Sequence, residues 1–372
     1  MDKSHRLIIC SPQLGISPKS TLGGEVYDRE AIERMANLGA EFHILLPKNR
    51  PYNKTKNVYV EYAPLKHIIP PYLYSIIMLP FLFMKYSRIK FDILRVHSHF
   101  LGPGAVFFKV IHPNIKLISH YHLDHEGLFV NLVNKILFKY SDLVVADSFY
   151  LKRQLSKKFS KEKGKIAVVH TGVDHRSIKP TKADETLINR YRLQGKVVIT
   201  FMGRFIKRKN PLFLLRLMKI LPKNTVLVLI GKGPQEEEIK KEAKLLGLED
   251  RILMPGILFG SRKLSYYSIS DIFVFPSLNE GFVLAVLEAM AAGLPLVLPN
   301  SGAFPEALSD GINGYLAKPN KVDDWVKKLT SLINDPNLRM RMGEASRKRV
   351  IKEFTWDIVA KNNIKACLSL LK

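Results

Sequence analysis

Two glutamates in the second half of the chain lie in sequence surroundings where a carboxylate without a binding partner would destabilise the fold. Glu280 follows a strand-like run that ends at Pro276-Ser277, and Glu288 lies inside the apolar stretch Val283–Ala292. An idle carboxylate among apolar side chains costs free energy. A helix that starts near Gly281 would separate the two carboxylates by about 12 Å, too far for a tight acid–base pair. We therefore expect each to hold a different part of a long ligand, and two solvated helix acids are the simpler alternative.

The start of that helix is itself a candidate anion site. Ser277 or Asn279 is a candidate N-cap. Helix N-termini carry partial positive charge and unpaired amides, which favour an anion such as a departing diphosphate. The amides concerned belong to Gly281, Phe282, Val283 and Leu284.

Two cations follow the strand-like run Val197–Met202. Gly203 at the end of this run lets a ligand approach the backbone, and Arg204 and Lys209 could hold a diphosphate. An ordinary basic turn is the alternative in a chain with this many cations. The next run ends in Gly231-Lys-Gly233, which is a weak nucleotide signal that a tight turn explains equally well.

Strand-like apolar runs alternate with amphipathic stretches along the chain. In the first half they are Arg6–Cys10, Phe42–Leu46, Ile93–Val96, Leu117–Ser119, Leu143–Ala146 and Ile166–Val169. In the second half they are Val197–Met202, Val226–Ile230, Arg251–Met254, Ile272–Phe275 and Pro295–Leu298. Near-continuous apolar strands separated by helices predict an α/β fold with parallel sheets covered on both faces.

A polar stretch without a strand signal, Lys179–Arg190, interrupts this alternation and marks a domain boundary. We predict two doubly wound, Rossmann-like domains, residues 1–180 and 181–355, facing each other across a cleft. A helical segment over residues 356–372 follows them. Ligands of such sheets bind beyond the carboxyl ends of the strands, so the strand-end loops are the places to seek a site.

A histidine cluster in the first half offers a different chemistry. His120-Tyr-His122-Leu-Asp124-His125 matches the zinc signature of metallo-β-lactamase-type hydrolases, in which imidazoles and a carboxylate bind zinc and activate water. Those enzymes need a further histidine far downstream, whereas all 11 histidines here lie at or before His175. A zinc-dependent hydrolase is therefore an alternative and not the preferred interpretation.

The spacing from Glu280 to Glu288, after Pro276-Ser277, resembles the glutamate signature of the retaining GT-B glycosyltransferases of family 4 (glycosyl transferases group 1). Further matches follow in chain order over nearly the whole sequence. They are the pair Gly23-Gly24, the segment Gly172-Val173-Asp174, Gly203-Arg204 with Lys209, the turn Gly231–Pro234, and the late loop Gly311–Gly314.

This resemblance implies a hexosyltransferase-type enzyme that works without a metal and without a cofactor. Its co-substrate would be a nucleoside-diphosphate sugar, and its acceptor a hydroxyl of a glycan, polysaccharide or lipid-linked acceptor. It also implies that the helix over residues 356–372 crosses back onto the N-terminal domain.

The resemblance implies a role for each matched residue. Arg204 and Lys209 would neutralise the leaving diphosphate, and Glu288 would bond the ribose hydroxyls. Glu280 and the amides of Gly281–Leu284 would address the transferred sugar. The remaining residues are Gly203, Gly231 and Gly233 for the donor, Gly23 and Gly24 for phosphate or acceptor, and His122 for the donor sugar, with His120 as second choice. Val283 stands where the family usually has a small residue, which alters the shape against the sugar.

The charge balance points to an anionic partner. Lys and Arg number 58 and Asp and Glu 33, which gives a net charge of +25. A nucleic-acid-binding protein is an alternative resting on charge alone, but the basic stretches contain few aromatic residues, so no nucleic acid is expected. An anionic membrane surface fits better, with the basic stretches 152–165 and 339–352 beside an apolar counterpart. That counterpart consists of Met78, Leu79, Phe81, Leu82, Phe83, Met84 and Tyr86.

The two cysteines, Cys10 and Cys367, are too few for a disulfide framework. The run Ile68–Met84 is short for a transmembrane span and contains three prolines, which break helices. We therefore expect a cytoplasmic protein, attached peripherally at the inner face of the membrane if the basic surface binds lipid.

Overall fold

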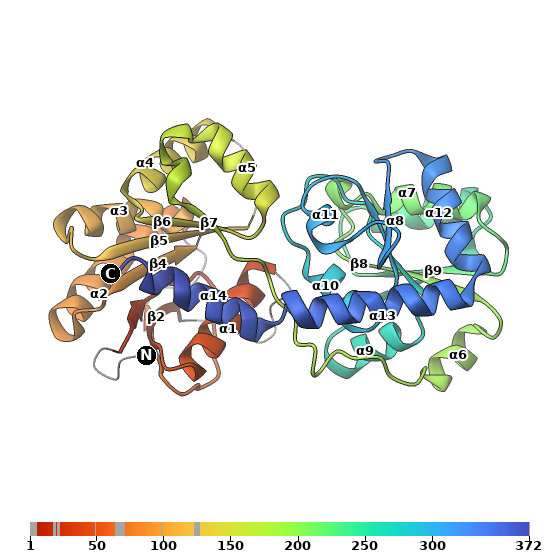
Figure 1. The fold of residues 1–372 in the computed structure, drawn as a ribbon, viewed down its shortest axis with the longest axis horizontal. Coiled ribbons are helices and arrows are strands. Elements are labelled where there is room, and N and C mark those ends of the chain that lie inside the picture. The colour runs from red at the N-terminus through yellow and green to blue at the C-terminus, as the bar shows by residue number, and fades with distance from the viewer. Residues whose placement is uncertain are drawn as a thin grey trace. The chain divides into compact units, whose positions relative to one another are not determined.

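The computed structural model describes residues 6–17, 20, 23–48, 50–63, 71–97, 99–122 and 127–371. It divides into two compact units (Figure 1). Unit 1 comprises Met1–Gly172 and Trp356–Lys372, and unit 2 comprises Val173–Thr355. The first crossing of the chain between the units thus lies at Gly172/Val173, eight residues before the boundary expected from the polar stretch.

Unit 1 is built on a parallel sheet. Among its described residues the order of the seven strands is β3-β2-β1-β4-β5-β6-β7. The strands are β1 (Ile8–Cys10), β2 (Glu41–Pro47), β3 (Val58–Ala63), β4 (Ile93–His97), β5 (Lys116–Tyr121), β6 (Leu143–Ala146) and β7 (Ile166–Val168). All residues of β4 are buried, as expected for a central strand covered on both faces. The sequence pattern did not reveal β3, whose polar and exposed residues are typical of a sheet edge.

Six helices of the described chain cover this sheet. They are α1 (Gly23–Asn37), α2 (Pro71–Ile89), α3 (Gly102–Ile111), α4 (Leu128–Tyr140), α5 (Phe149–Lys158) and α14 (Trp356–Leu368). Two 3₁₀ turns, η1 (His99–Leu101) and η2 (Ser160–Lys165), complete the connections. The right-handed crossover rule places α2, α3, α4 and α5 on one face of the sheet and α1 on the other, where α14 packs against it (Figure 1).

Unit 2 repeats the design with a second parallel sheet. Its strand order among the described residues is β10-β9-β8-β11-β12-β13. The strands are β8 (Val197–Met202), β9 (Thr225–Ile230), β10 (Ile252–Gly256), β11 (Ile272–Val274), β12 (Leu296–Pro299) and β13 (Gly314–Ala317). The sequence pattern missed β13, whose first residue, Gly314, pairs with Leu296 so closely that a Cβ would lie 2.1 Å from the Leu296 carbonyl oxygen.

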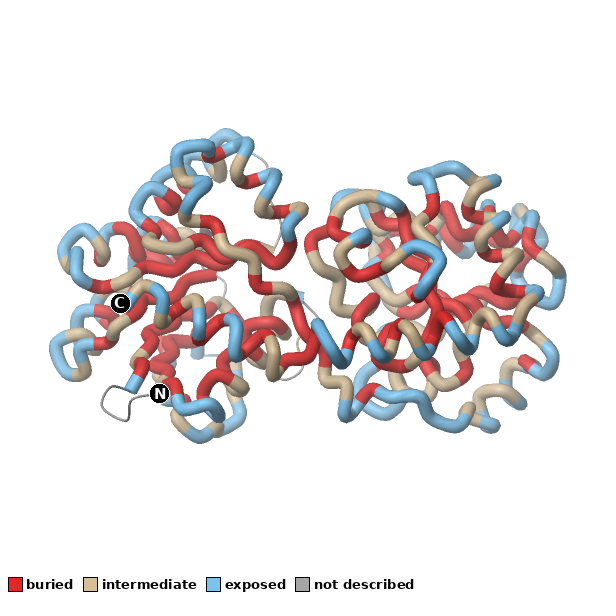
Figure 2. The backbone as a smooth tube through the Cα atoms, in the orientation of Figure 1, coloured by how far each residue is buried: buried red, intermediate tan, exposed pale blue. Residues whose placement is uncertain are grey.

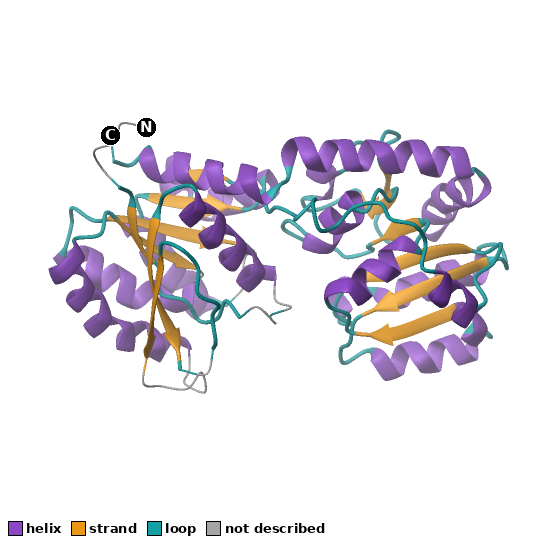
Figure 3. Cartoon of the chain, turned by 90° about the horizontal axis from the view of Figure 1, so that it is seen from below, coloured by secondary structure: helices purple, strands orange, loops and turns teal. Residues whose placement is uncertain are grey.

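Helices cover both faces of the second sheet, as the view in Figure 3 shows. They are α6 (Glu185–Tyr191), α7 (Pro211–Ile220), α8 (Glu236–Leu245), α9 (Gly260–Ser268), α10 (Leu284–Ala291), α11 (Phe304–Ala307), α12 (Val322–Asn334) and α13 (Pro336–Glu353), with 3₁₀ turns η3 (Lys207–Lys209) and η4 (Glu249–Arg251). Figure 2 shows the buried residues concentrated along the strands of each unit.

The two crossings of the chain run side by side. Val173 and Thr355 form an isolated parallel bridge, and the Val173 amide donates to the Phe354 carbonyl at 2.9 Å. At Gly172 a Cβ would lie 2.8 Å from the Trp356 ring, so only glycine fits beside the start of α14. The Gly172-Val173-Asp174 motif therefore serves the place where the chain leaves unit 1 and returns to it.

The apolar run that includes α2 is a packed helix. Met78, Phe81 and Leu82 are buried in the core of unit 1, and Leu79 and Tyr86 pack against it partly buried. Of the seven apolar residues expected to touch a membrane, only Phe83 and Met84 are exposed. Within the described ranges, no helix has both the length and the apolarity needed to span a bilayer.

Candidate active site

The direction of the strand order in unit 2 changes between β8 and β11. The chain proceeds from β8 to β9 and β10 on one side, and from β11 to β12 and β13 on the other. In open α/β sheets the loops beyond the carboxyl ends of such strands form the ligand-binding crevice. Here these loops are Gly203–Asn210 after β8 and Phe275–Val283 after β11. They contain the predicted cations and Glu280.

The structure brings Glu280 and Lys209 into direct contact. Lys209 Nζ lies 2.8 Å from Glu280 Oε1, and Arg208 Nη1 lies 2.6 Å from the same oxygen. The Ser277 hydroxyl also donates to this oxygen. Glu280 is only 5% exposed, so its negative charge is stabilised by these partners rather than by water.

Backbone contacts hold the two loops together. Ser277 Oγ, whose single proton is shared between two acceptors, also lies 2.8 Å from the Arg208 carbonyl oxygen, and the Leu278 amide donates to the same carbonyl at 3.3 Å. On the other side of Glu280, the Ala303 amide donates to the Glu280 carbonyl at 3.1 Å. A Cβ at Gly302 would lie 2.8 Å from that oxygen, so a glycine is needed for this approach. Glu280 is thus fixed by three segments at once.

The ammonium group of Lys209 lies among charged and aromatic neighbours. Burial lowers the pKa of its ammonium group, Glu280 opposes this shift, and the nearby charges of Arg208 and Arg204 reinforce it. Its Nζ also lies 4.9 Å from the centre of the Phe275 ring, within the range of a cation–π contact. Arg204 is exposed, and its charge adds to that of Lys209 and Arg208. Two cations therefore contact one carboxylate at the end of β8, and the charge of Arg204 acts on Lys209 from nearby.

The predicted glycines of this region lie close together for a packing reason. A Cβ at Gly231 would lie 2.0 Å from the Gly203 carbonyl oxygen, and one at Gly233 would lie 2.4 Å from the Phe205 carbonyl oxygen. At Gly203 a Cβ would press on the Phe201 and Phe275 rings at 3.2 and 3.3 Å. These glycines let the loops after β8 and β9 pack against each other, which fixes the backbone beside Arg204.

The helix after Glu280 begins later than the sequence suggested. α10 starts at Leu284, and its N-cap is Val283, whose side chain makes no capping hydrogen bond. The expected N-caps were wrong because the Ser277 hydroxyl is engaged by Glu280 and Arg208, and because Asn279 has a left-handed φ of 55°. Gly281, Phe282 and Val283 therefore form a loop, and the amide of Leu284 is the first of the helix.

Glu288 lies on the second turn of α10 with its own partners. Lys263 Nζ, from α9, lies 2.6 Å from Oε1, and the Tyr267 hydroxyl donates to Oε2 at 3.0 Å. Burial together with the Glu288 charge raises the pKa of Tyr267 well above its usual value, so the hydroxyl keeps its proton. The same hydroxyl lies 3.4 Å from Met202 Sδ at the end of β8. Glu288 is therefore a hydrogen-bond acceptor held near the carboxyl end of β8.

His122 belongs to a stack of three imidazoles in unit 1. The rings of His97 and His120 are stacked with centroids 4.6 Å apart, and those of His97 and His122 are 5.4 Å apart. His122 Nε2 lies 3.3 Å from His97 Nδ1, and His122 Nδ1 lies 3.7 Å from Asp147 Oδ2. A Cβ at Gly24 would be in ordinary contact with the His122 ring at 3.6 Å. Gly23 and Gly24 form the first turn of α1, so the predicted glycine pair borders the predicted histidine.

A buried ion pair contacts this stack of imidazoles. Arg95 is fully buried, its Nη1 lies 2.9 Å from Asp28 Oδ1, and the same carboxylate oxygen contacts His97 Nε2. Burial raises the pKa of Asp28 to about 6, and Arg95 and His122 oppose the shift. Burial and then Arg95 lower the pKa of His97 and of His120 well below the usual range, so both rings are neutral near pH 7.

The zinc alternative gains no support from this arrangement. Arg95 Nε donates to His120 Nε2 at 3.1 Å, which places a guanidinium where a metal cation would need to bind. Asp124 and His125 lie outside the described residues. Throughout the part of the chain that the structure describes, no group of three or more histidine, cysteine or acidic side chains is arranged to hold a metal ion.

Sequence reasoning missed several residues of these clusters, among them Arg95, His97 and Asp147 around the histidines. Arg208 was overlooked between two predicted cations, although its charge and position were signals. Lys263 and Tyr267 could not be found from spacing, because they reach Glu288 from a separate helix. Asp28 lies on α1 five residues after Gly23 and carried no recognisable motif.

Two protein-family models match the chain. The model described as Glycosyl transferases group 1 matches residues 184–349, and the model described as Glycosyltransferase Family 4 matches residues 22–177. An uncharacterized glycosyltransferase of Methanocaldococcus jannaschii is 27% identical over 338 residues, which cover 84% of this chain and 84% of that protein. A D-inositol 3-phosphate glycosyltransferase of Corynebacterium aurimucosum is 25% identical over 91% of this chain and 89% of its own length.

Solved structures share the fold at low sequence identity. Sucrose-phosphate synthase from Thermosynechococcus elongatus has a TM-score of 0.84 and 20% identity, covering 98% of this chain and 99% of that chain. Anabaena HepE, solved in complex with UDP and glucose, has a TM-score of 0.80 and 16% identity, covering 98% of this chain and 100% of its own. The predicted fold class, α/β with two doubly wound domains of the GT-B type, is confirmed.

Proposed function

Since the chain belongs to the group 1 glycosyltransferases of family 4, we propose that it moves a sugar from a nucleoside diphosphate to a hydroxyl acceptor with retention of anomeric configuration. The observation that carries this proposal is the pair of cations on Glu280 at the end of β8, with the charge of Arg204 close to Lys209. Arg208 and Lys209 contact the carboxylate directly, and Arg204 contributes its charge beside them.

This cation group suits a leaving diphosphate. Glycosyl transfer develops positive charge at the anomeric carbon and negative charge on the departing phosphate. Fixed cations that need no reorganisation stabilise the second charge effectively, because their orientation is already set by Glu280 and the loop contacts. We assign Lys209 and Arg204 to the diphosphate and add Arg208 to them. These cations also supply the charge that a divalent metal would otherwise provide, which supports a metal-independent reaction.

Glu288 suits the ribose of the nucleotide. An ionised carboxylate can accept hydrogen bonds from two adjacent hydroxyls. Lys263 and Tyr267 hold the Glu288 carboxylate in one orientation at the edge of the crevice that contains Lys209. We therefore assign Glu288 to the ribose. Glu280 and the backbone of Gly281–Leu284 are assigned to the transferred sugar.

In unit 1 we assign His122 to the donor sugar, with Gly23 and Gly24 beside it. The ring is partly exposed and is fixed by stacking on His97 and by an edge contact with Tyr27 at 4.6 Å between centroids. His97 presents its Nε2 to the Asp28 carboxylate and is neutral, so its Nδ1 is an acceptor. His122 Nε2 must then donate to His97 Nδ1. The other ring nitrogen of His122, Nδ1, faces the Asp147 carboxylate.

The donor and acceptor are proposed at the level of chemical class. Anabaena HepE binds UDP and glucose, which favours a uridine nucleotide and a hexose as the first candidates. The D-inositol 3-phosphate glycosyltransferase among the relatives acts, by its name, on a phosphorylated polyol. We propose a hydroxyl of a glycan, a polysaccharide precursor or a lipid-linked acceptor, in glycan or glycolipid biosynthesis.

A donor panel followed by product analysis tests the proposal. Thermal unfolding is measured with UDP-, GDP- and ADP-sugars, since a ligand at 100 times its Kd stabilises the folded state by about 2.7 kcal/mol. The donor that raises the midpoint is then incubated with the enzyme, and proton NMR follows the anomer that is released first, by transfer or slow hydrolysis. We expect the configuration of the donor to be kept. The opposite anomer would contradict retention, and no shift with any donor would contradict sugar-nucleotide binding.

A further inference from the structure

One face of unit 1 is covered by helices that contain no acidic residue. α2, α3, α4 and α5 include neither Asp nor Glu, whereas α1, on the opposite face of the sheet, contains four acids. The basic residues of the acid-free helices are Lys85, Arg88, Lys109, Lys135, Lys139, Lys152, Arg153, Lys157 and Lys158. Lys85 and Lys109 are paired with Glu61 and Asp142, and the remaining basic residues leave this face positive, which favours an anionic partner.

The same helices expose large apolar side chains. On α4 the side chain of Leu128 is 92% exposed, and those of Phe129 and Leu132 are 60% and 55% exposed. These residues and Ile136 recur at helical spacing, so they form one stripe along α4. The neighbouring α3 and α2 add to this surface with Phe107, Val110, Ile111, Leu73 and Ile76, all of them exposed. An apolar surface spread over three adjacent helices marks an interaction site.

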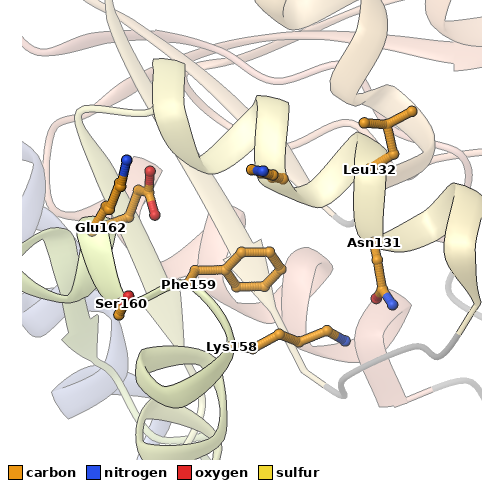
Figure 4. A pocket seen from close by; sticks show the side chains of 8 residues that line it. Asn131, Leu132, Lys158, Phe159, Ser160 and Glu162 are labelled. Carbon is orange, nitrogen blue, oxygen red and sulfur yellow. The ribbon is translucent and has the colours of Figure 1, made fainter.

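A cavity lies at the basic edge of this stripe, between α4 and the turn η2. It measures about 420 Å³ and is drawn in Figure 4. Phe159 forms its apolar floor, and Lys158 extends across it toward Asn131 in this view. The other lining residues are Leu132, Lys135, Ser160, Lys161 and Glu162. Three lysines against one glutamate leave the cavity positive.

Two further features concern the cavity: hydrogen bonds that fix its wall, and a polar atom that lacks a partner. Lys165 donates to the carbonyls of Lys139 and Ser141 at 3.0 and 2.9 Å, which ties η2 to the end of α4. The amide oxygen of Asn131 is buried and has no hydrogen-bond partner within the described part of the chain. A buried acceptor of this kind needs a donor, such as a hydroxyl of a bound ligand.

We propose that this face docks on an anionic lipid bilayer, with the α4 stripe inserted among the acyl chains and a phosphate headgroup in the cavity lined by Lys135, Lys158 and Lys161. The positive charges of the lysines would attract the phosphate, and the amide oxygen of Asn131 would accept a hydrogen bond from a headgroup hydroxyl. A nucleic acid would use the lysines but would leave the exposed leucine and phenylalanine side chains without a partner. A second copy would place acid-free basic helices against each other. The proposal uses residues other than those assigned to the sugar nucleotide, and its test does not depend on transfer.

Vesicle binding of the full chain tests the proposal without any donor. Co-sedimentation is measured with phosphatidylcholine vesicles and with vesicles that also contain phosphatidylglycerol, whose headgroup carries a phosphate and hydroxyls. We expect binding to the anionic vesicles only, and weaker binding at high salt because the lysine contribution is screened. Equal affinity for both vesicle types, or no binding at low salt, would overturn the proposal.

Matched pairs of variants separate the lysines from the apolar stripe. Lys135→Gln with Lys161→Gln should weaken vesicle binding about 25-fold, since ~1 kcal/mol for each basic residue at an anionic surface corresponds to about fivefold. Phe129→Ser with Leu132→Ser should weaken it by at least about tenfold. The controls, Lys219→Gln with Lys223→Gln and Ile220→Ser with Leu245→Ser, change exposed residues of unit 2. Unchanged binding of either test pair would overturn the proposal, as would an equal loss in the controls.

Insertion has its own spectroscopic signature. Leu128→Trp should show a blue-shifted emission with phosphatidylglycerol vesicles and quenching by brominated acyl chains, whereas Leu245→Trp should show neither. Three results would overturn the proposal: no shift at Leu128→Trp, RNA binding that depends on Lys135 and Lys161 without vesicle binding, and a dimer in sedimentation that the Phe129/Leu132 pair abolishes without vesicle binding.

Discussion

Two carboxylates of unit 2 differ in their partners, and this difference supports the two roles proposed for them. Glu280 is buried and accepts from Ser277, Arg208 and Lys209, so it orients cations. Glu288 is less buried and is held by Lys263 and Tyr267 from a separate helix. The two carboxylates share no partner among the described contacts, and the binding of different parts of a long ligand stays a prediction.

Glu288→Gln should weaken the binding of a nucleoside-diphosphate sugar by roughly tenfold or more. The amide replaces a charged acceptor, and a hydrogen bond to a charged group contributes about 1.5–3 kcal/mol. Isothermal titration with the donor chosen by the panel measures the loss. Glu237→Gln, an exposed glutamate on α8, is the matched control and should bind as the wild type does. Equal affinities for Glu288→Gln and wild type would remove Glu288 from the donor site.

At the scale of the elements, the strand-end loops were predictable and the contacts between them were not. Long apolar strands such as β8 and β9 are evident in the sequence, and so are the glycines that follow them. The start of α10 was not predictable, because the hydroxyl of Ser277 binds a residue 69 positions earlier in the chain instead of capping the helix. Likewise Lys263 reaches Glu288 only after α9 and α10 have packed. Tertiary contacts of this kind leave no local signal.

Gly233→Ala should disturb the packing of the loops after β8 and β9. Its Cβ would lie 2.4 Å from the Phe205 carbonyl oxygen and 2.7 Å from the Phe205 amide nitrogen. We expect the free energy of unfolding to fall by about 1–3 kcal/mol, the usual cost of overpacking. Donor affinity should fall as well, because Phe205 follows Arg204 directly and a displaced Phe205 backbone would move Arg204. The measurements are denaturant unfolding and donor titration.

Gly164→Ala, in the turn η2 of unit 1, is the matched control. A Cβ there would meet nothing within 4 Å, so the change should leave both quantities close to those of the wild type. If Gly233→Ala were as stable as Gly164→Ala, the two loops could not be packed as closely as the structure describes.

At the scale of the whole molecule, the two units share one type of arrangement: a parallel sheet whose strand order reverses, with charged groups beyond the strand ends. In unit 1 the corresponding group is buried, and Arg95, Asp28 and three histidines interact beneath the start of α1. Asp28 makes the stability of the folded protein depend on pH. Its folded-state pKa of about 6 exceeds the ordinary value of 3.8, so the folded state binds this proton more tightly than the unfolded chain does.

The contribution of Asp28 to stability is therefore complete below pH 3.8 and is lost as the pH rises to about 6. Relative to Asp28→Asn, which cannot titrate, the wild type should lose roughly 2 kcal/mol of unfolding free energy between pH 4.5 and pH 7. Urea unfolding of both proteins across this range measures the difference. Titration of His97 and His120 occurs in both proteins. A difference that stays constant or changes in the opposite direction would contradict the raised pKa.

The central claim is that Lys209 binds the diphosphate of a sugar nucleotide, and calorimetric titration with UDP, GDP and ADP tests it most directly. Four proteins are compared: wild type, Lys209→Met, Lys209→Met with Glu280→Gln, and Lys207→Met, which removes an exposed lysine of the same turn. The double variant matters because Lys209→Met alone leaves excess negative charge at Glu280, which would repel the ligand by itself.

We predict that at least one nucleoside diphosphate binds the wild type and Lys207→Met equally well. Both proteins that lack Lys209 should bind it at least about tenfold more weakly, since a charged hydrogen bond is lost. Affinity equal to the wild type in Lys209→Met, or affinity fully restored in the double variant, would contradict the account.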